Sequence, residues 1–157
     1  MKTKIASALL ILAVCILSRP VLAGDRFTDN GDGTVTDNKL GLMWAKSSNI
    51  GDINWHDAEK WAKFTFSDTI PAGHTDWRLP TLEELKSLYD KTAKGYETNC
   101  GRVVKIAPVI KLDCGWIWTS ERKSITAVVY NFQRGYHYTD RMVHKRDYRV
   151  LPVRSIK

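Results

Sequence analysis

Runs of β-forming residues separated by turn residues predict a hairpin near the start of the folded chain. Residues 27–29 and 34–37 are rich in Thr, Val and Phe, and residues 30–33 read Asn-Gly-Asp-Gly, which tolerates positive φ angles. A second turn at residues 38–41 leads into an apolar strand at residues 42–44. The acidic residues of this segment do not have EF-hand spacing, so we interpret it as turns and not as a calcium loop.

Two amphipathic segments in the first half of the chain predict helices. The first runs from about residue 55 to residue 64, with Asn54 as N-cap. Its apolar side chains share one face at helical spacing: Trp55, Ala58, Trp61 and Ala62. The second begins at Thr81, which is expected to form a capping box with Glu84, and ends near Asp90.

The second half of the chain has strand patterns. We expect strands at residues 116–119, 127–132, 136–138 and 148–153. Within residues 127–132 the side chains alternate with a period of two, which is typical of a half-buried strand. Early helices with strands at both ends predict an α+β fold, in which two helices pack on a small antiparallel sheet and the terminal strands pair.

The first 23 residues have the pattern of an export signal. A basic start is followed by a 13-residue stretch, 5–17, that is apolar except for Ser7, and by small residues at the positions read by a signal peptidase. Thirteen residues are too few to span a bilayer as a helix. We therefore expect cleavage after Ala23, loss of Cys15 and one domain over residues 24–157, in a periplasmic, secreted or cell-surface protein. An uncleaved N-terminal anchor is the alternative.

Two cysteines stay in the mature chain. Cys100 and Cys114 are expected to form a disulfide, because an exported protein matures where disulfides persist. Neither belongs to a Cys-x-x-Cys pair, and no histidine lies at zinc-ligand spacing from them. A catalytic thiol or a metal site is therefore the weaker interpretation.

Composition and charge narrow the function classes. The 157 residues carry a formal charge of +7, which falls to +4 without the first 23 residues. A chain with 43% hydrophobic and 26% charged residues is neither collagen, a coiled coil, a multi-span membrane protein nor a wholly disordered chain. This mild basic excess permits a polyanionic partner.

The basic excess is concentrated near the C-terminus, where residues 134–149 carry a net charge of +3. Arginine forks bind sulfate and carboxylate through charge-assisted hydrogen bonds, and tyrosines offer flat faces to a sugar ring. The residues predicted to bind a polyanion are Arg134, Tyr136, His137, Arg141, Lys145 and Arg146. The alternative is a solvated loop or edge strand whose charges prevent aggregation.

Three segments carry a more specific pattern. Residues 26–37 with 41–45, the run Gly-His-Thr-Asp-Trp-Arg-Leu-Pro-Thr at residues 73–81 and the closing residues 148–154 closely resemble the Lcl C-terminal-domain family, named after the tail of a Legionella collagen-like surface protein. The resemblance implies a C-type-lectin-like fold. It also implies an adhesin module, because the namesake domain binds sulfated glycosaminoglycans. The calcium-and-sugar motifs of true C-type lectins do not occur here, so calcium-dependent monosaccharide binding is not expected.

The best-matched segment supplies residues that we interpret as structural. Asp76 and Arg78 are expected to pair internally and to orient the second helix, since internal ion pairs commonly fix geometry. With Trp77, Thr81 and Glu84 they form the predicted structural motif.

Signatures of catalysis are sparse. The sequence has no Gly-x-Ser-x-Gly elbow, no His-Glu-x-x-His and no phosphate-binding glycine loop, so we expect no enzyme activity, no metal and no cofactor. The leading hypothesis is an exported module that binds anionic polysaccharide or another envelope polyanion, with no nucleic-acid partner and no membrane span after signal cleavage. A protein-interaction subunit or inhibitor of the cell envelope is second, and an enzyme is third.

Overall fold

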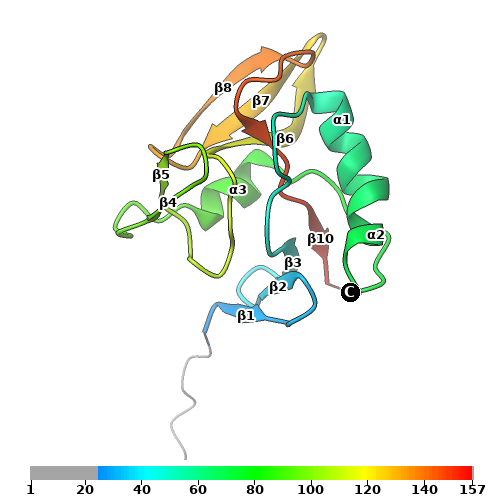
Figure 1. Ribbon diagram of the computed structural model, residues 1–157, viewed down its shortest axis with the longest axis vertical. Coiled ribbons are helices and arrows are strands. Elements are labelled where there is room, and N and C mark those ends of the chain that lie inside the picture. The colour runs from blue at the N-terminus through cyan, green and yellow to red at the C-terminus, as the bar shows by residue number, and fades with distance from the viewer. Residues whose placement is uncertain (1–24, 157) are drawn as a thin grey trace, which may run out of the picture.

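The computed structural model describes residues 25–156 (Figure 1). The predicted signal peptide, residues 1–23 with Cys15, lies outside the described residues. The described part has an α+β fold with short helices, two four-stranded sheets and a two-stranded sheet. The predicted α+β class is confirmed.

The first sheet gathers the two ends of the described chain. Its order is β1-β2-β3-β10, with antiparallel pairing throughout. The strands are β1 (Phe27–Asp29), β2 (Thr34–Asp37), β3 (Leu42–Ala45) and β10 (Val153–Ser155). The hairpin and the second turn are confirmed. The terminal strands share this sheet, but the prediction that they pair with each other is wrong, because β10 pairs with β3.

The second sheet has the order β8-β7-β6-β9. Its strands are β6 (Trp116–Lys123), β7 (Thr126–Asn131), β8 (Tyr136–Arg141) and β9 (Tyr148–Arg149). β9 runs parallel to β6, and the other pairs are antiparallel. The short strands β4 (Tyr96–Glu97) and β5 (Val103–Val104) pair separately. The expectation of one small antiparallel sheet is therefore wrong.

The C-terminal strand expected at residues 148–153 is split between the two large sheets. β9 ends at Arg149 in the second sheet, and β10 begins at Val153 in the first. Pro152 stands at the crossing, where its missing N–H removes a ladder donor and its carbonyl accepts from Ala45 at 2.8 Å. This crossing ties the two sheets together.

The first helix extends further than its sequence pattern predicts. It consists of α1 (Trp55–Lys60), a π-helical turn η1 (Trp61–Thr65) and α2 (Phe66–Thr69). The Asn54 side chain accepts from the backbone N–H of Asp57, as expected for an N-cap. The π turn brings Phe66, which is buried, onto the core side five residues after Trp61.

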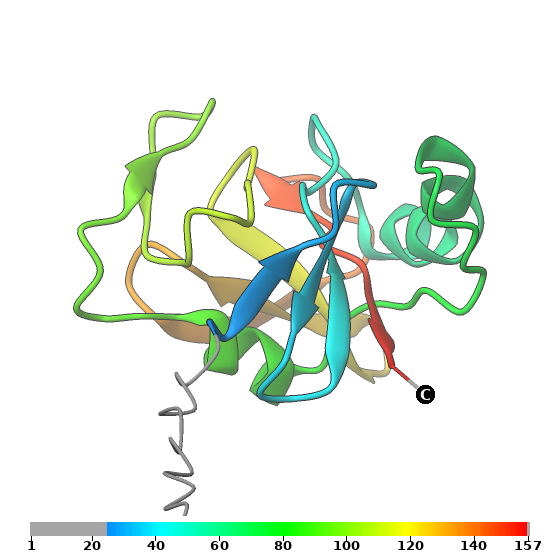
Figure 2. The same ribbon diagram turned by 90° about the horizontal axis from the view of Figure 1, so that it is seen from below.

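The second helix is α3 (Leu82–Leu88), and it has the predicted capping box at Thr81 and Glu84. Figure 2 shows α1–α2 and the β4–β5 hairpin on opposite sides of the molecule. Leu85 and Leu88 of α3 are buried in the larger core.

Strand β7 of the second sheet is buried on both of its faces. Tyr130 of β7 belongs to the core around α3, whereas Ala127 and Val129 belong to a second core around α1. The period-two pattern of β7 therefore marks two different cores, and the expectation of a half-buried strand is wrong.

The predicted disulfide joins Cys100 to Cys114, whose Cα atoms lie 5.4 Å apart. It closes the segment that contains β5 and leads into β6. Among the helices of residues 25–156, none is long and apolar enough to cross a membrane.

Candidate functional site

The predicted basic segment divides between the two ends of β8, an edge strand of the second sheet. Arg134 and Tyr136 lie at the β7–β8 turn, and Arg141 ends the strand. Five residues of an antiparallel strand separate Tyr136 from Arg141 by about 17 Å. The six predicted binding residues are all exposed, but they do not form one continuous patch.

Strand alternation separates them further. Tyr136 opposes Asn131 across the ladder, whereas His137 opposes Tyr130, so their side chains point to opposite faces of the sheet. The Tyr136 ring meets the Trp116 ring edge to face at 5.4 Å. Tyr136 is therefore part of an aromatic surface around Trp116 and does not lie beside His137.

A denser group of cations lies at the other end of the sheet. Arg141 opposes Thr126 in β7, and Thr126 opposes Lys123 in β6. Lys123 and Arg141 therefore share one face, on either side of Thr126. We call the group formed by the following exposed residues the cationic tip: Arg122, Lys123, Arg141, Lys145 and Arg146.

Two members of the cationic tip were missed by the sequence analysis. Arg122 and Lys123 lie some twenty residues before Arg141 in the chain, and the antiparallel ladder alone brings them together. A signal was present in the sequence: Arg-Lys-Ser at residues 122–124 falls between two predicted strands, where a hairpin turn is expected.

The helix α1 contributes the other boundary of the cationic tip. The Arg122 guanidinium lies over the Trp55 ring, 5.3 Å from its centroid. The Lys145 ammonium is 3.8 Å from an Asp57 carboxylate oxygen, with both side chains about half exposed. Within residues 25–156, the other four cations of the tip form no salt bridge, so they remain available to an anion.

A polar cluster holds the segment behind the cationic tip in place. Asp140 accepts from the Tyr148 hydroxyl and lies 2.8 Å from His144 Nδ1, and the hydroxyls of Tyr138 and Tyr148 are 2.6 Å apart. Burial acts to raise the pKa of Asp140, but hydrogen bonds from Tyr148, from the Arg141 N–H and from His144 outweigh it and lower that pKa. Burial and the hydrogen bonds with Asp140 and Tyr138 raise the pKa of Tyr148.

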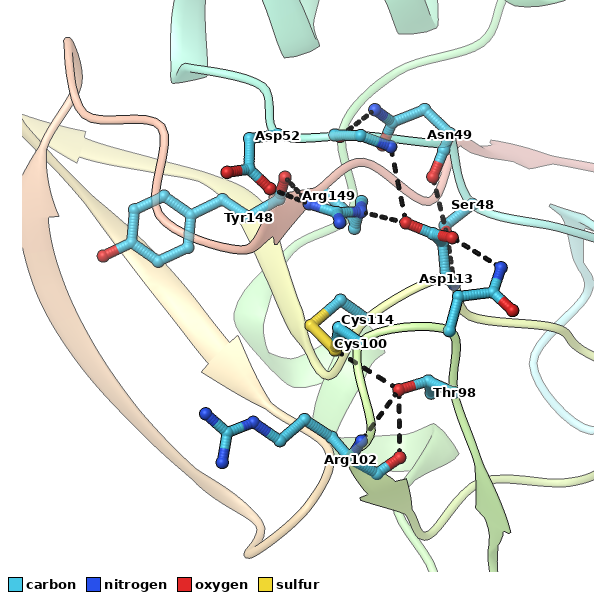
Figure 3. The surroundings of a disulfide bond; sticks show 12 residues. Ser48, Asn49, Asp52, Thr98, Cys100, Arg102, Asp113, Cys114, Tyr148 and Arg149 are labelled. Atoms are coloured by element: carbon cyan, nitrogen blue, oxygen red, sulfur yellow. Dashed lines mark hydrogen bonds and ion pairs between the residues drawn. A yellow bond between two sulfur atoms is a disulfide. The ribbon is translucent and has the colours of Figure 1, made fainter.

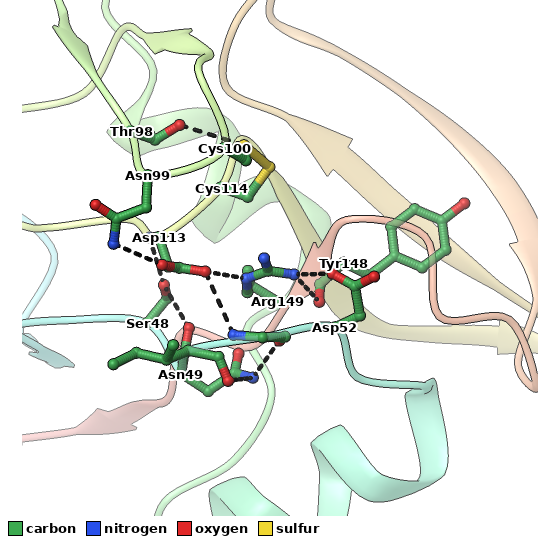
Figure 4. A network of polar contacts seen from close by, with 12 residues as sticks. Ser48, Asn49, Asp52, Thr98, Asn99, Cys100, Asp113, Cys114, Tyr148 and Arg149 are labelled. Atoms are coloured by element: carbon green, nitrogen blue, oxygen red, sulfur yellow. Dashed lines mark hydrogen bonds and ion pairs between the residues drawn. A yellow bond between two sulfur atoms is a disulfide. The ribbon is translucent and has the colours of Figure 1, made fainter.

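Arg149 does not contribute to an exposed basic surface. Its side chain is only 6% exposed, and it pairs with Asp113 at 2.6 Å and with Asp52 at 2.7 Å (Figures 3 and 4). The expectation that the basic surface extends over residues 134–149 is therefore wrong at its last residue. A guanidinium buried between two carboxylates is neutralised where it stands.

The Arg149 network joins distant parts of the chain. Asp113 also accepts from Asn99 at 2.7 Å, beside the disulfide (Figure 4). The side chain of Asn49 accepts from the Val150 N–H at 2.8 Å. Burial acts to raise the pKa of Asp113, yet the hydrogen bonds from Asn99 and Arg149 outweigh it and lower that pKa. The network fixes β9 against the disulfide loop and the loop before α1.

The structural motif pairs internally, although Asp76 and Arg78 take different partners. Arg78 forms two hydrogen bonds with Glu84, at 2.7 and 2.8 Å, at the start of α3. Asp76 pairs with Arg154 of β10 at 2.6 Å. Trp77 is buried and packs edge to face on Phe66. With the Thr81 cap, the motif attaches α3 and α2 to the first sheet.

Two clefts lie on either side of the exposed loop around Ile50. One, of about 570 Å³, has Trp61, Phe66 and Ile70 along one wall. The other, of about 500 Å³, is lined by Tyr96, Asn99 and Asp113 among others. Residues 25–156 contain no group of three or more His, Cys, Asp or Glu side chains that could hold a metal ion.

A comparison with models of protein families identifies the family of this chain. The model of the Lcl C-terminal domain matches residues 33–154, from the turn before β2 to β10. The chain belongs to the Lcl C-terminal domain family. A search of curated proteins found no match.

Membership of the Lcl C-terminal domain family suggests an adhesin-associated module. The matched range contains the structural motif, the disulfide and the whole cationic tip. This family and a disulfide are compatible with an exported protein.

Proposed function

We propose that this chain is an exported, non-catalytic binding module of C-type-lectin-like fold that binds an anionic polysaccharide through the cationic tip. The observation that carries the proposal is the convergence of five exposed cations from three separate segments on one end of the second sheet. Periplasm or cell surface is the proposed location.

Charge and geometry favour a sulfated or carboxylated sugar chain. Arg122 and Arg141 offer planar forks for bidentate hydrogen bonds, and Lys123 adds a point charge beside Arg141. A polysaccharide repeats its anionic groups, so several of them can meet separate cations at once. Such binding weakens steeply with salt, because the polyanion recovers its released counterions.

A non-catalytic role is supported by the state of the nearby titratable groups. Asp140, Tyr148 and His144 hydrogen-bond to one another behind the cationic tip. These internal hydrogen bonds hold the segment of residues 140–148 in place. The Tyr148 side chain is fully buried and its hydroxyl is bonded to Asp140 and Tyr138, so this hydroxyl is not open to a substrate.

The experiment is retention of the purified protein on immobilised heparin over a salt gradient. Arg141→Ala/Lys145→Ala/Arg146→Ala should elute at clearly lower salt than wild type. A matched control removes the same charge elsewhere: Lys39→Ala/Lys91→Ala/Lys94→Ala, at three exposed lysines outside the tip. Equal elution of both variants would show that total charge alone governs retention and would reject the proposed site.

A further inference from the structure

Two exposed aliphatic side chains project from the middle of the cationic tip. Ile125, in the β6–β7 turn, is 59% exposed, and Val143, just after β8, is 64% exposed. The Met142 N–H donates to the Ile125 carbonyl at 2.9 Å, which places these two turns side by side. Apolar side chains exposed together at a loop end are a frequent mark of an interaction surface.

The turns that present Ile125 and Val143 are held by the fold. The Thr126 hydroxyl donates to the Lys123 carbonyl at 3.0 Å across the β6–β7 turn. The Trp55 N–H donates to the Met142 carbonyl at 3.0 Å, so the start of α1 supports the Val143 turn. Little conformational entropy remains to be lost when such a surface binds.

Cations surround the aliphatic pair from both faces of the sheet. Lys123 and Arg141 flank it on the face of Thr126, and Arg122 lies on the opposite face over Trp55. Apolar groups at the end and cations behind them form the usual arrangement of a peripheral membrane contact, in which cations meet anionic headgroups and apolar groups enter the acyl boundary.

The position of the cationic tip favours a flat partner. Figure 1 shows the β6–β7 turn at one end of the long axis, opposite β1. A broad surface can approach this end without meeting the first sheet. The cations alone can bind a polysaccharide, whereas a lipid leaflet also offers an apolar phase in which the exposed side chains of Ile125 and Val143 can be buried.

We propose that the cationic tip docks on an anionic lipid surface, with Ile125 and Val143 inserted at the boundary between headgroups and acyl chains. The inference rests on the proposed function, because the same cations bind the anionic groups, and it adds an anionic lipid leaflet as a second partner of the cationic tip. The contact is peripheral and leaves the rest of the domain in water.

The experiment measures binding to vesicles of phosphatidylcholine with and without an equal part of phosphatidylglycerol. Wild type should bind only the anionic vesicles. Ile125→Ser/Val143→Ser should bind them roughly tenfold more weakly, because the apolar insertion is lost. Its matched control, Leu40→Ser/Val103→Ser, alters two exposed aliphatic residues outside the cationic tip and should bind as wild type does.

Heparin retention of the same variants separates this inference from the proposed function. Ile125→Ser/Val143→Ser should keep wild-type heparin retention, since its cations are intact. If wild type binds heparin but not anionic vesicles, or if the aliphatic variant binds vesicles as well as wild type does, the docking proposal is wrong while the proposed function stands. If wild type binds neither, both are wrong. Circular dichroism of each variant confirms that it is folded.

Discussion

Arg149 shows how the meaning of a charged residue depends on partners that lie far away in the sequence. In the basic C-terminal segment it resembles Arg146, which is exposed. Asp113 and Asp52 neutralise it inside the molecule instead. Their separation from Arg149 by 36 and 97 positions hides the pairing from any local pattern. Burial of Arg149 removes one cation from the binding surface and makes it a structural residue.

Replacement of Arg149 should destabilise the fold much more than replacement of its exposed partner. Arg149→Ala leaves the Asp113 carboxylate, only 9% exposed, without its guanidinium, and we expect a loss of about 3 kcal/mol in the free energy of unfolding. Asp52→Asn, at a carboxylate that is 46% exposed, should cost about 1 kcal/mol or less. Urea denaturation measures both. Equal losses would contradict the assignment of Asp113 as the buried partner.

Glu84 should make stability depend on pH in the acidic range. Burial acts to raise its pKa, but hydrogen bonds from Arg78 and Thr81 outweigh burial and hold the pKa below the ordinary 4.5. The folded state therefore binds this proton less readily than the unfolded state. The stabilisation is complete above about pH 5 and is lost as the pH falls through the lowered pKa.

The measurement is the free energy of unfolding of wild type and Glu84→Gln from neutral pH down to about pH 3. Wild type should lose stability more steeply below pH 4.5, the ordinary pKa of this group. Asp113 and Asp140, whose pKa values are also lowered, leave the variant with a smaller decline of its own. Parallel curves for the two proteins would show that the Arg78–Glu84 pair contributes nothing.

At the scale of elements, local signals predicted the starts of both helices and the approximate end of the second, and failed at the end of the first. The Asn54 cap and the Thr81 capping box depend on neighbouring residues, so the sequence contains all their information. The end of the first helix depends on a π turn that places Phe66 in the core, and only tertiary packing reveals that turn. The division of residues 148–153 between two sheets has the same origin.

The candidate site was also predicted only in part from the sequence. Exposure of Arg141, Lys145 and Arg146 followed from their position in a polar segment. The split between the two ends of β8, and the addition of Arg122 and Lys123, depend on strand register. Register is set by long-range pairing, and a list of charges along the chain does not contain it.

Loss of the disulfide cross-link should lower the free energy of unfolding. Cys100 and Cys114 close a loop of about 15 residues, for which chain entropy gives about 3 kcal/mol. Cys100→Ser/Cys114→Ser should lower the free energy of unfolding by about that amount. Reduced wild type should match the variant, and reductant should not change the variant further. A variant as stable as oxidised wild type would show that the cross-link adds no stability.

At the scale of the whole molecule, the two sheets and two cores serve to hold one end of the second sheet in a fixed shape. The disulfide and the Arg149 network fix the start of β6, and the Asp140 cluster holds the segment behind the cationic tip. α1 packs beside it through Trp55. The proposed binding surface is thus built from strand ends and turns on a rigid support, which reduces the entropy lost on binding.

The most direct test of polyanion binding at the cationic tip is the salt dependence of affinity for a soluble heparin fragment. The logarithm of the binding constant should fall linearly with the logarithm of salt concentration, and each cation removed from the tip should reduce the slope by about one. Arg122→Ala, Lys123→Ala and Arg141→Ala should each do so, whereas Arg134→Ala, at the far end of β8, should leave the slope unchanged. A slope that responds equally to Arg134 and to Arg141, or to neither, would contradict binding at the cationic tip.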